Sequence, residues 1–249
     1  DAEDDRLKKF AVSDPNETFT SEVYAISEDK EGQIWVGTNK GVFVYYNPQN
    51  VFDEEGFYAS HILIPRNDGS GLADRLLQEE EVTCIEIDGA NRKWFGTKNA
   101  GAFLFSEDGL EQIHNFNTNN SPIFSDHILD IEVEGKSGEV FFSTPEGLVS
   151  YKSTASEANE QDEKTYAYPN PVRPGYEGPI TITGLVPDAS VKITDINGNL
   201  VYETNTLGGQ AIWYGKDLEG RRVRSGVYLV LCTNDDGSQT KMTKILVVR

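Results

Sequence analysis

Cysteine, methionine and histidine are scarce in this sequence, which has two cysteines, one methionine and three histidines among 249 residues. Two cysteines are too few for the disulfide framework of a small secreted domain, and no Cys-x-x-Cys pair or Cys/His cluster offers a zinc site. Cys84 and Cys232 lie in apolar segments that we assign to different domains, so we expect both to be buried free thiols. His61, His114 and His127 lie far apart in the sequence. An isolated histidine lacks the oriented partner that acid–base catalysis needs, so we expect strand or rim residues rather than bases.

Long apolar runs and basic residues are also few. No stretch of about 18 apolar residues occurs, which excludes a membrane-spanning helix. No secretory signal begins at Asp1, so we expect a mature product or part of a longer protein. The 41 acidic residues outnumber the 22 basic ones and give a net charge of −19. Such a surface repels a phosphate backbone, so nucleic acid is not an expected partner.

The acidic excess is uneven along the chain. Residues 1–166 carry 33 acidic and 13 basic residues, whereas residues 167–249 carry 8 acidic and 9 basic residues. This asymmetry indicates two separate bodies.

One stretch of sequence occurs three times. Residues 29–45 read DKEGQIWVGTNKGVFVY, residues 88–105 read DGANRKWFGTKNAGAFLF, and residues 135–151 read GKSGEVFFSTPEGLVSY. Each copy contains two turns and two short segments rich in β-branched and aromatic residues, which are typical of strands. The apolar runs are nearly continuous, as in strands covered on both faces, and radially stacked sheets of this kind form a β-propeller. We expect Trp35 and Trp94 in the core rather than as glycan-stacking platforms.

The repeats predict three sets of inner strands, and three outer strands can be added at Arg6–Val12, Ser60–Pro65 and Leu110–Phe116. The third copy has no outer strand after it. Because propellers use about four to eight blades, we predict a partial β-propeller over residues 1–152, with about three blades of a larger ring. Its uncovered blade edges predict oligomer contacts. Arg66–Glu81 is expected to be a solvated rim loop that ends in one or two helical turns.

The last third of the chain predicts a different domain. Residues 153–166 are mostly polar and are expected to form a linker. Residues 167–249 contain several short strands, and Asn197-Gly198 is a strong signal for a β-hairpin. We therefore predict an all-β chain in which the propeller blades are followed by an immunoglobulin-like β-sandwich.

Both parts resemble known families. The sequence DKEGQIWVGTNKGVFVYYNP resembles the two-component regulator propeller repeat, which builds periplasmic sensor domains and exported surface proteins of Bacteroidetes-type bacteria. After it, YPNPV, VKITDINGNLVYE, AIWYGKDLEGRRVRSGVYLV and KMTKILVVR resemble, in order, the C-terminal sorting domain of the type IX secretion system. That resemblance implies export across the outer membrane to the cell surface. In most cargo of this system a sortase then removes the domain.

The combination of DGANRKWFGT, NSPIFSDHI, GEVFFSTPEGLVSY and YPNPVRPGYEGPI is similar to the PorZ-type family of the type IX secretion system. This resemblance implies a retained sorting-type domain, other proteins of the surface attachment complex as partners, and handling of anionic lipopolysaccharide for the sortase. We therefore expect a non-catalytic, exported binding and scaffold protein at the outer-membrane surface. One alternative is a glycan-binding propeller carried as type IX cargo. Another is a periplasmic ligand-sensing propeller, although such sensors continue into a membrane segment.

A cationic cluster is the candidate contact site. Lys216, Arg221, Arg222 and Arg224 fall in a predicted hairpin of the sandwich, and arginine pairs bidentately with phosphate and carboxylate groups. We predict that these residues contact an anionic lipopolysaccharide or a partner protein. The alternative interpretation is a solvated turn.

Carboxylates do not predict a catalytic, cofactor or metal site. Asp29 and Asp88 precede turn glycines and are expected to accept hydrogen bonds from backbone N–H groups of those turns. Glu79, Glu80 and Glu81 are consecutive, so their side chains do not converge on one point if the segment is extended.

Overall fold

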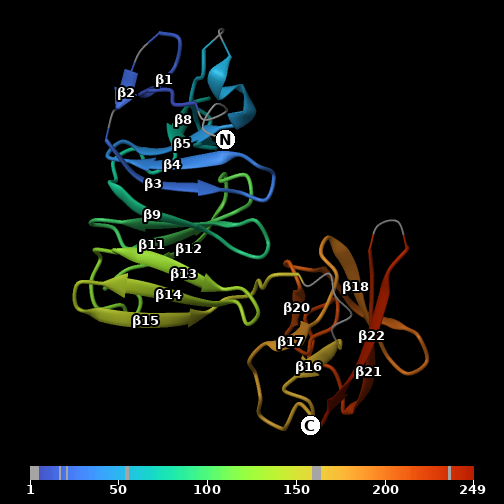
Figure 1. Ribbon diagram of the computed structural model, residues 1–249. Helices are drawn as coiled ribbons and strands as arrows, with labels where there is room; N and C mark the ends of the chain where they lie inside the picture. The colour runs from blue at the N-terminus through green and yellow to red at the C-terminus, as the bar shows by residue number, and fades with distance from the viewer. Residues whose placement is uncertain (1–5, 17, 21, 54–55, 159–163, 235–236) are drawn as a thin grey trace. The chain divides into compact units, whose positions relative to one another are not determined.

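The computed structural model describes the chain except for residues 1–5, 17, 21, 54–55, 159–163 and 235–236. The regular secondary structure of the described chain is almost entirely β-strand, which confirms the predicted fold class (Figure 1). It divides into two compact units, of which the first is built mainly from Asp1–Ile87 and Asn91–Val133 and the second mainly from Lys152–Arg249. Residues 159–163 of the predicted linker lie outside the described residues. The helical structure in the described part is one short 3-10 helix, η1 (Pro48–Phe52), and no helix there is long and apolar enough to cross a membrane.

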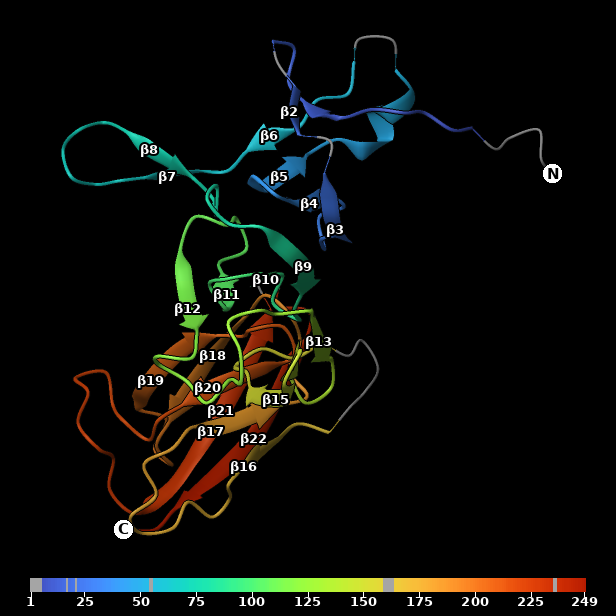
Figure 2. The same ribbon diagram turned by 90° about the vertical axis from the view of Figure 1, so that its left-hand side faces the viewer.

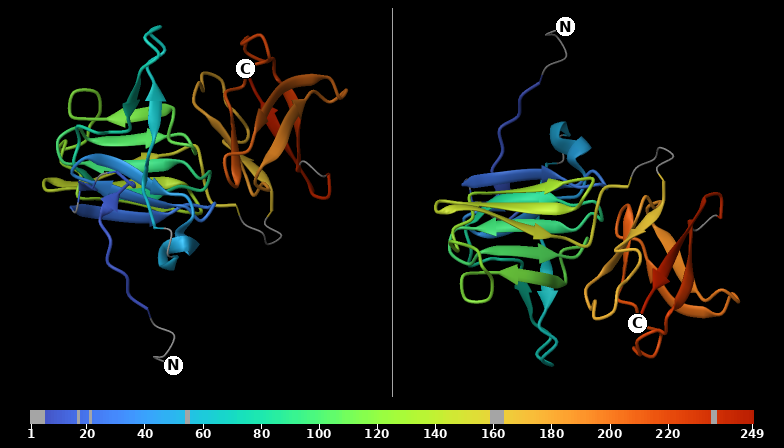
Figure 3. Two further views of the ribbon diagram at one scale, coloured as in Figure 1. Left: turned by 90° about the horizontal axis from the view of Figure 1, so that it is seen from above. Right: turned by 90° about the horizontal axis from the view of Figure 1, so that it is seen from below.

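The first unit contains three antiparallel sheets that follow the three sequence repeats and stack one on the next (Figure 3). The strand orders are β3-β4-β5-β6, β12-β11-β10-β9 and β13-β14-β15. Their bounds are β3 Val23–Glu28, β4 Ile34–Thr38, β5 Gly41–Tyr45, β6 Ser60–His61, β9 Val82–Ile87, β10 Lys93–Thr97, β11 Ala102–Phe105, β12 Gln112–Phe116, β13 Asp130–Glu134, β14 Glu139–Thr144 and β15 Gly147–Lys152. Among the described residues the third sheet has three strands.

Apolar side chains fill the two spaces between these sheets. Trp35 and Phe95 belong to the core between the first and second sheets, and Trp94 and Phe142 to the core between the second and third. Trp35 is 1% exposed and Trp94 0% exposed, which confirms that both tryptophans are core residues. Burial of such large side chains between sheets is the main favourable contribution to this fold.

The Gly-Thr pair that follows each tryptophan has a physical role. A Cβ on Gly37 would lie 2.8 Å from the side chain of Val82 in the next sheet, so glycine permits the close approach of the two sheets. The threonine hydroxyl then closes the turn that follows. Thr38 Oγ1 donates to Gly41 O at 2.9 Å, and Thr97, three residues after Trp94, repeats the contact to Gly101 O at 2.8 Å.

Two expectations for the first unit are wrong. Arg6–Val12 is not a strand, because only Val12 of this segment pairs, as part of β1 (Val12–Ser13) with β2 (Thr18–Thr20). Arg66–Glu81 does not end in helical turns, because residues 76–79 form hydrogen-bonded turns in which Leu77 has a positive φ of 51°. It includes β8 (Ala73–Arg75), which pairs with β7 (Leu63–Pro65) in a separate hairpin that extends away from the first sheet (Figure 2).

Tertiary contacts explain the hairpin. Leu76 is 1% exposed; its N–H donates to Ile62 O at 3.0 Å, and its carbonyl accepts from Val42 N–H at 3.3 Å. These contacts hold the segment extended although its residues favour helix. The predicted outer strand Ser60–Pro65 is consequently divided, with β6 in the first sheet and β7 in the hairpin. The prediction for Leu110–Phe116 is confirmed by β12.

The second unit is built from two antiparallel sheets with strand orders β16-β17-β20 and β19-β18-β21-β22. Their bounds are β16 Tyr166–Tyr168, β17 Ile180–Thr183, β18 Ala189–Thr194, β19 Leu200–Asn205, β20 Gln210–Trp213, β21 Gly226–Asn234 and β22 Thr240–Val247. One core, which includes Trp213, is shared by the two sheets. Asn197 and Gly198 form the turn between β18 and β19, as predicted, and Gly198 has a φ of 85°. Cys84 and Cys232 are buried free thiols, also as predicted.

Candidate functional site

The predicted cationic residues lie together in the connection between β20 and β21. Lys216 and Arg222 form an antiparallel bridge, and the turn between them is closed by Asp217. Its backbone N–H donates to Arg221 O at 2.8 Å, and its Oδ1 accepts from the N–H groups of Glu219 and Arg221 at 3.0 and 2.9 Å. An aspartate at the start of a tight turn commonly accepts such bonds. The local sequence therefore fixes the positions from which the four cationic side chains project.

Two of the arginines already have carboxylate partners. Arg221 Nε contacts Asp217 Oδ2 at 3.0 Å, and its guanidinium also pairs with Glu219. Hydrogen bonding to Asp217, followed by the charges of Asp217 and Glu219, raises the pKa of Arg221. Arg222 pairs with Glu177 at 2.5 Å and donates to Tyr176 O at 3.3 Å. Part of the predicted cationic surface is thus neutralised within the protein.

The remaining two cations differ from this pair. Among the described residues, no carboxylate forms an ion pair with the side chain of Lys216 or Arg224. Both residues are exposed, and the Arg224 carbonyl accepts a hydrogen bond from the hydroxyl of Tyr228 at 2.8 Å. The loop therefore keeps two cations without a carboxylate partner beside two arginines held in surface pairs.

A cavity of about 630 Å³ adjoins this loop. Its charged lining residues are three arginines and three carboxylates, namely Arg221, Arg222, Arg224, Asp195, Asp217 and Glu219. The apolar part of the lining includes Leu200 and Tyr228. A ligand here meets both signs of charge, so an anion gains most beside Arg224, and it reaches Arg221 or Arg222 by displacing an exposed glutamate. Glu219 and Glu177 have side chains that are 66% and 74% exposed, and exposed ion pairs of this kind contribute little stability.

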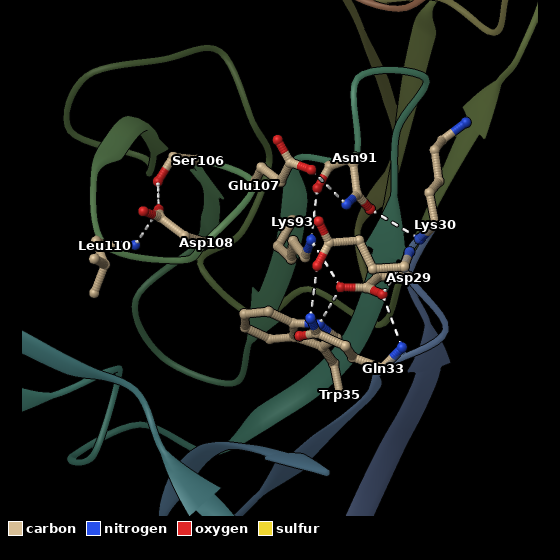
Figure 4. A network of polar contacts seen from close by, with 11 residues as sticks. Asp29, Lys30, Gln33, Trp35, Asn91, Lys93, Ser106, Glu107, Asp108 and Leu110 are labelled. Carbon is tan, nitrogen blue, oxygen red and sulfur yellow. Dashed lines mark hydrogen bonds and ion pairs between the residues drawn. The ribbon is translucent and has the colours of Figure 1, made fainter. Parts of the chain in front are cut away.

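Sequence reasoning missed a buried ion pair in the first unit (Figure 4). Asp29 Oδ1 accepts from Gln33 N–H at 2.9 Å, as predicted for a turn carboxylate. Its Oδ2 accepts from Trp35 Nε1 at 2.8 Å and lies 3.1 Å from the ammonium of Lys93 in the second sheet. Lys93 also donates to Asn91 O at 2.7 Å and lies over the Trp35 ring at 4.9 Å. The pair therefore connects the first and second sheets within their core.

Burial acts on both members of this pair. Desolvation is the largest influence on Lys93, and it lowers the pKa of the ammonium although Asp29 acts in the opposite direction. Desolvation is also the largest influence on Asp29 and acts to raise its pKa. Hydrogen bonds from Gln33, Trp35 and Lys93 together outweigh it, and the pKa of Asp29 is lowered. Because both side chains are removed from solvent and each charge has partners inside the core, we assign the pair a structural role.

A second cavity, of about 490 Å³, lies beside this pair. Trp35, Tyr46 and Ile62 form its apolar lining, and Glu31 and Glu107 are among its acidic residues. Among the described residues there is no group of three or more His, Cys, Asp or Glu side chains that could hold a metal ion.

The three histidines lie in separate places. His61 packs against Phe19 and Phe43. His114 lies 3.2 Å from the Tyr151 hydroxyl, and His127 is in the connection between β12 and β13.

Comparisons with known proteins agree with the two-part organisation. Residues 166–248 match the family described as the secretion system C-terminal sorting domain, and residues 19–40 match the two component regulator propeller. Among solved structures, PorZ of Porphyromonas gingivalis, an essential bacterial surface component of the type-IX secretion system, is similar with 30% identity and a TM-score of 0.66. The alignment covers 96% of this chain and 32% of that chain, so the present chain spans about a third of its length.

A second solved structure is more distant. The extracellular domain of the putative hybrid two component system BT3049 from B. thetaiotaomicron aligns with 15% identity and a TM-score of 0.42, over 96% of this chain and 46% of that one. The comparison with curated proteins gives no match.

Proposed function

Because the chain is of PorZ type, with a propeller repeat followed by a sorting-type sandwich, we propose that it is an exported, non-catalytic binding component of the type IX secretion system at the outer-membrane surface. Its partners in this proposal are other proteins of the surface attachment complex. The observation that carries the proposal is the order of the two parts, combined with 30% identity to PorZ over nearly the whole chain. The stacked sheets of the first unit supply a rigid body, which suits a scaffold.

The proposal requires that the sandwich is retained in the mature protein. Native protein released from the cell surface should have an intact mass that includes residues 167–249. A chain that ends within residues 153–166 would identify the protein as processed cargo, for which a glycan-binding propeller is the leading alternative, and would overturn the scaffold proposal. Recovery from the periplasmic fraction alone would instead favour the ligand-sensing alternative.

The ligand in this proposal is an anionic lipopolysaccharide, which the loop with Lys216, Arg221, Arg222 and Arg224 would contact beside the 630 Å³ cavity. Two features support it. Lys216 and Arg224 are exposed, and the carboxylates that hold Arg221 and Arg222 are themselves exposed enough to be displaced. A phosphate can then take two parallel hydrogen bonds from each guanidinium.

Charge reversal tests this contact. Arg221→Glu combined with Arg222→Glu should reduce the lipopolysaccharide retained by the purified full chain by about tenfold, which corresponds to about 1.4 kcal/mol. Lys136→Glu, in the turn between β13 and β14, is the matched control and should leave retention unchanged. Unchanged retention in the double variant would remove the loop from the proposal, while the intact-mass result would still stand as an independent test of the scaffold.

A further inference from the structure

The last strand of the sandwich has one paired edge and one edge that is only half covered. β22 pairs with β21 along its whole length, from Thr240 opposite Thr233 to Val247 opposite Gly226. It is the outer strand of its sheet (Figure 1). The edge of such a strand presents a row of backbone N–H and C=O groups that can pair with another chain.

The C-terminal half of the outer edge is covered by the YPNPV segment. The side-chain amide of Asn170 makes the hydrogen bonds that a neighbouring strand would make. Its Nδ2 donates to Lys244 O at 2.8 Å, and its Oδ1 accepts from Leu246 N–H at 3.0 Å. Val172 continues the cover. Its N–H donates to Leu246 O at 2.8 Å, and its carbonyl accepts from Val248 N–H at 2.9 Å.

In the described chain no strand hydrogen-bonds to the N-terminal half of this edge, although β16 lies near β22. Backbone groups alternate between the two edges of a strand. The Lys244 carbonyl and the backbone groups of Leu246 face the outer edge. The N–H and C=O of Met242, two residues before Lys244, must therefore face the same edge. No described strand pairs with β22 there. The N–H and C=O of Met242 and the N–H of Lys244 are therefore positioned to pair with a further strand.

A groove of about 560 Å³ follows this open edge. Leu229 and Met242 form its apolar lining, and Met242 is 66% exposed. The charged residues among its described lining are three lysines, Lys164, Lys241 and Lys244, with no carboxylate among them. This local excess of positive charge contrasts with a chain whose net charge is −19.

We propose that the open edge of β22 binds an extended segment of a partner protein in which acidic side chains alternate with apolar ones. The segment would add a strand to the sheet through Met242 and Lys244, place apolar side chains over Met242 and Leu229, and pair carboxylates with Lys164 and Lys244. A second copy of this edge is a poor occupant, because edge-to-edge pairing would bring Lys241 and Lys244 against like charges. The inference goes beyond the proposed function, because it concerns the full chain whether or not the sandwich is later removed.

Defined peptides test the proposal with the full chain. The probe is a fluorescent nine-residue peptide, acetylated and amidated, in which glutamates alternate with valines. Its counterparts carry lysine for glutamate, or N-methyl groups on the backbone positions that would pair. Fluorescence anisotropy gives the affinities, and NMR hydrogen exchange of the Met242 and Lys244 amides locates the binding.

The glutamate peptide should bind at least about tenfold more tightly than either counterpart, with slower exchange of the two amides. Met242→Pro removes one outward donor, which edge strands tolerate, and Lys164→Glu with Lys244→Glu reverses the charge. Each change should weaken binding about tenfold. The control, Lys40→Glu with Lys136→Glu, reverses two exposed lysines outside the groove and should leave the affinity for the peptide within about twofold.

Three results would overturn the proposal. These are no binding of the glutamate peptide at about 1 mM, equal binding of its N-methylated counterpart, and protection of amides elsewhere in the chain. If Met242→Pro does not fold, the N-methylated peptide and the charge reversal still decide the outcome. An effect of the control pair equal to that of Lys164→Glu with Lys244→Glu would show a general charge effect and would also reject the proposal.

Discussion

The buried pair of Asp29 and Lys93 gives an unequal prediction for its two members. Both side chains are fully removed from solvent, with exposed fractions of 1% and 0%. In Asp29→Asn, the ammonium of Lys93 loses its ion pair, the one carboxylate contact it makes among the described residues, and keeps the carbonyl of Asn91 as a hydrogen-bond acceptor. An uncompensated buried charge costs about 3–5 kcal/mol, so we expect that loss in the free energy of unfolding of the first unit.

The reverse substitution should cost less. In Lys93→Met, the carboxylate of Asp29 keeps three hydrogen-bond donors, the N–H groups of Glu31 and Gln33 and the indole of Trp35. Methionine also fills most of the volume of the lysine stem. We therefore expect a loss of about 1–3 kcal/mol, and the double variant should lose less than the sum, with a coupling of about 0.5–3 kcal/mol.

Differential scanning calorimetry of the full chain, with denaturant unfolding followed by tryptophan fluorescence, measures these losses. Lys98→Met is the matched control, because it breaks the 3.0 Å pair with Glu81 at partly exposed positions and should cost less than about 1 kcal/mol. Equal losses in the two single variants, or strict additivity in the double variant, would refute the structural role of this ion pair between the first and second sheets. So would a loss in Lys98→Met as large as that in Asp29→Asn.

Four further results are expected. Asp29 has a lowered pKa, so below its ordinary value of 3.8 the unfolded chain binds more protons and stability should fall with pH in an acid titration. Gly96→Ala should destabilise the first unit by about 1–3 kcal/mol in thermal unfolding, because its Cβ would collide with the side chains of Cys84 and Ile128. Thr38→Val should cost about 1 kcal/mol by the same measurement, through loss of the bond to the Gly41 carbonyl. Burial raises the pKa of Cys84 to about 12, so native protein should react with a thiol reagent far more slowly at this residue than unfolded protein does.

The fold class was predictable because its signals are local and repeated. The periodic turns, the nearly continuous apolar strands and the tryptophan at the centre of two copies all require a sheet covered on both faces. The Asn197-Gly198 turn is equally local, since only these two residues and the flanking apolar segments decide it. The boundaries of the two predicted domains, 1–152 and 167–249, remain predictions.

The segment Arg66–Glu81 was not predictable from local preference. Its residues favour helix, and its hairpin form depends on the hydrogen bond that Leu76 N–H donates to Ile62 O and on the one that Leu76 O accepts from Val42 N–H, both from residues distant in the sequence. Contacts of this kind override helix propensity. A sequence signal was present nonetheless, because Asp68, Gly69 and Gly71 are turn residues in the middle of the segment, and both glycines have positive φ.

The buried lysine also left a signal in the repeat. Lys93 directly precedes Trp94, and the matching positions in the other two copies are Ile34 and Val140. An alignment of the three copies thus places a charge at an apolar position, and a buried ammonium requires a carboxylate partner. The repeat even indicates the partner, because Asp29 stands at the turn of the preceding copy. Comparison of equivalent positions within one chain therefore carries information that a reading of each strand alone does not.

The cationic loop shows where such reasoning changes a functional hypothesis. Asp217 and Glu219 precede Arg221 by four and two residues, so neutralisation of that arginine is visible in the sequence once the turn is recognised, whereas the pairing of Arg222 with Glu177 is long-range. Lys216 and Arg224, which have no carboxylate partner among the described residues, then become the residues on which anion binding depends most. Substitution of Lys216 and Arg224 by glutamine should consequently reduce lipopolysaccharide retention at least as much as removal of the paired arginines. The opposite order would mean that Arg221 and Arg222, once Glu219 and Glu177 are displaced, contribute more to binding than the two unpaired cations.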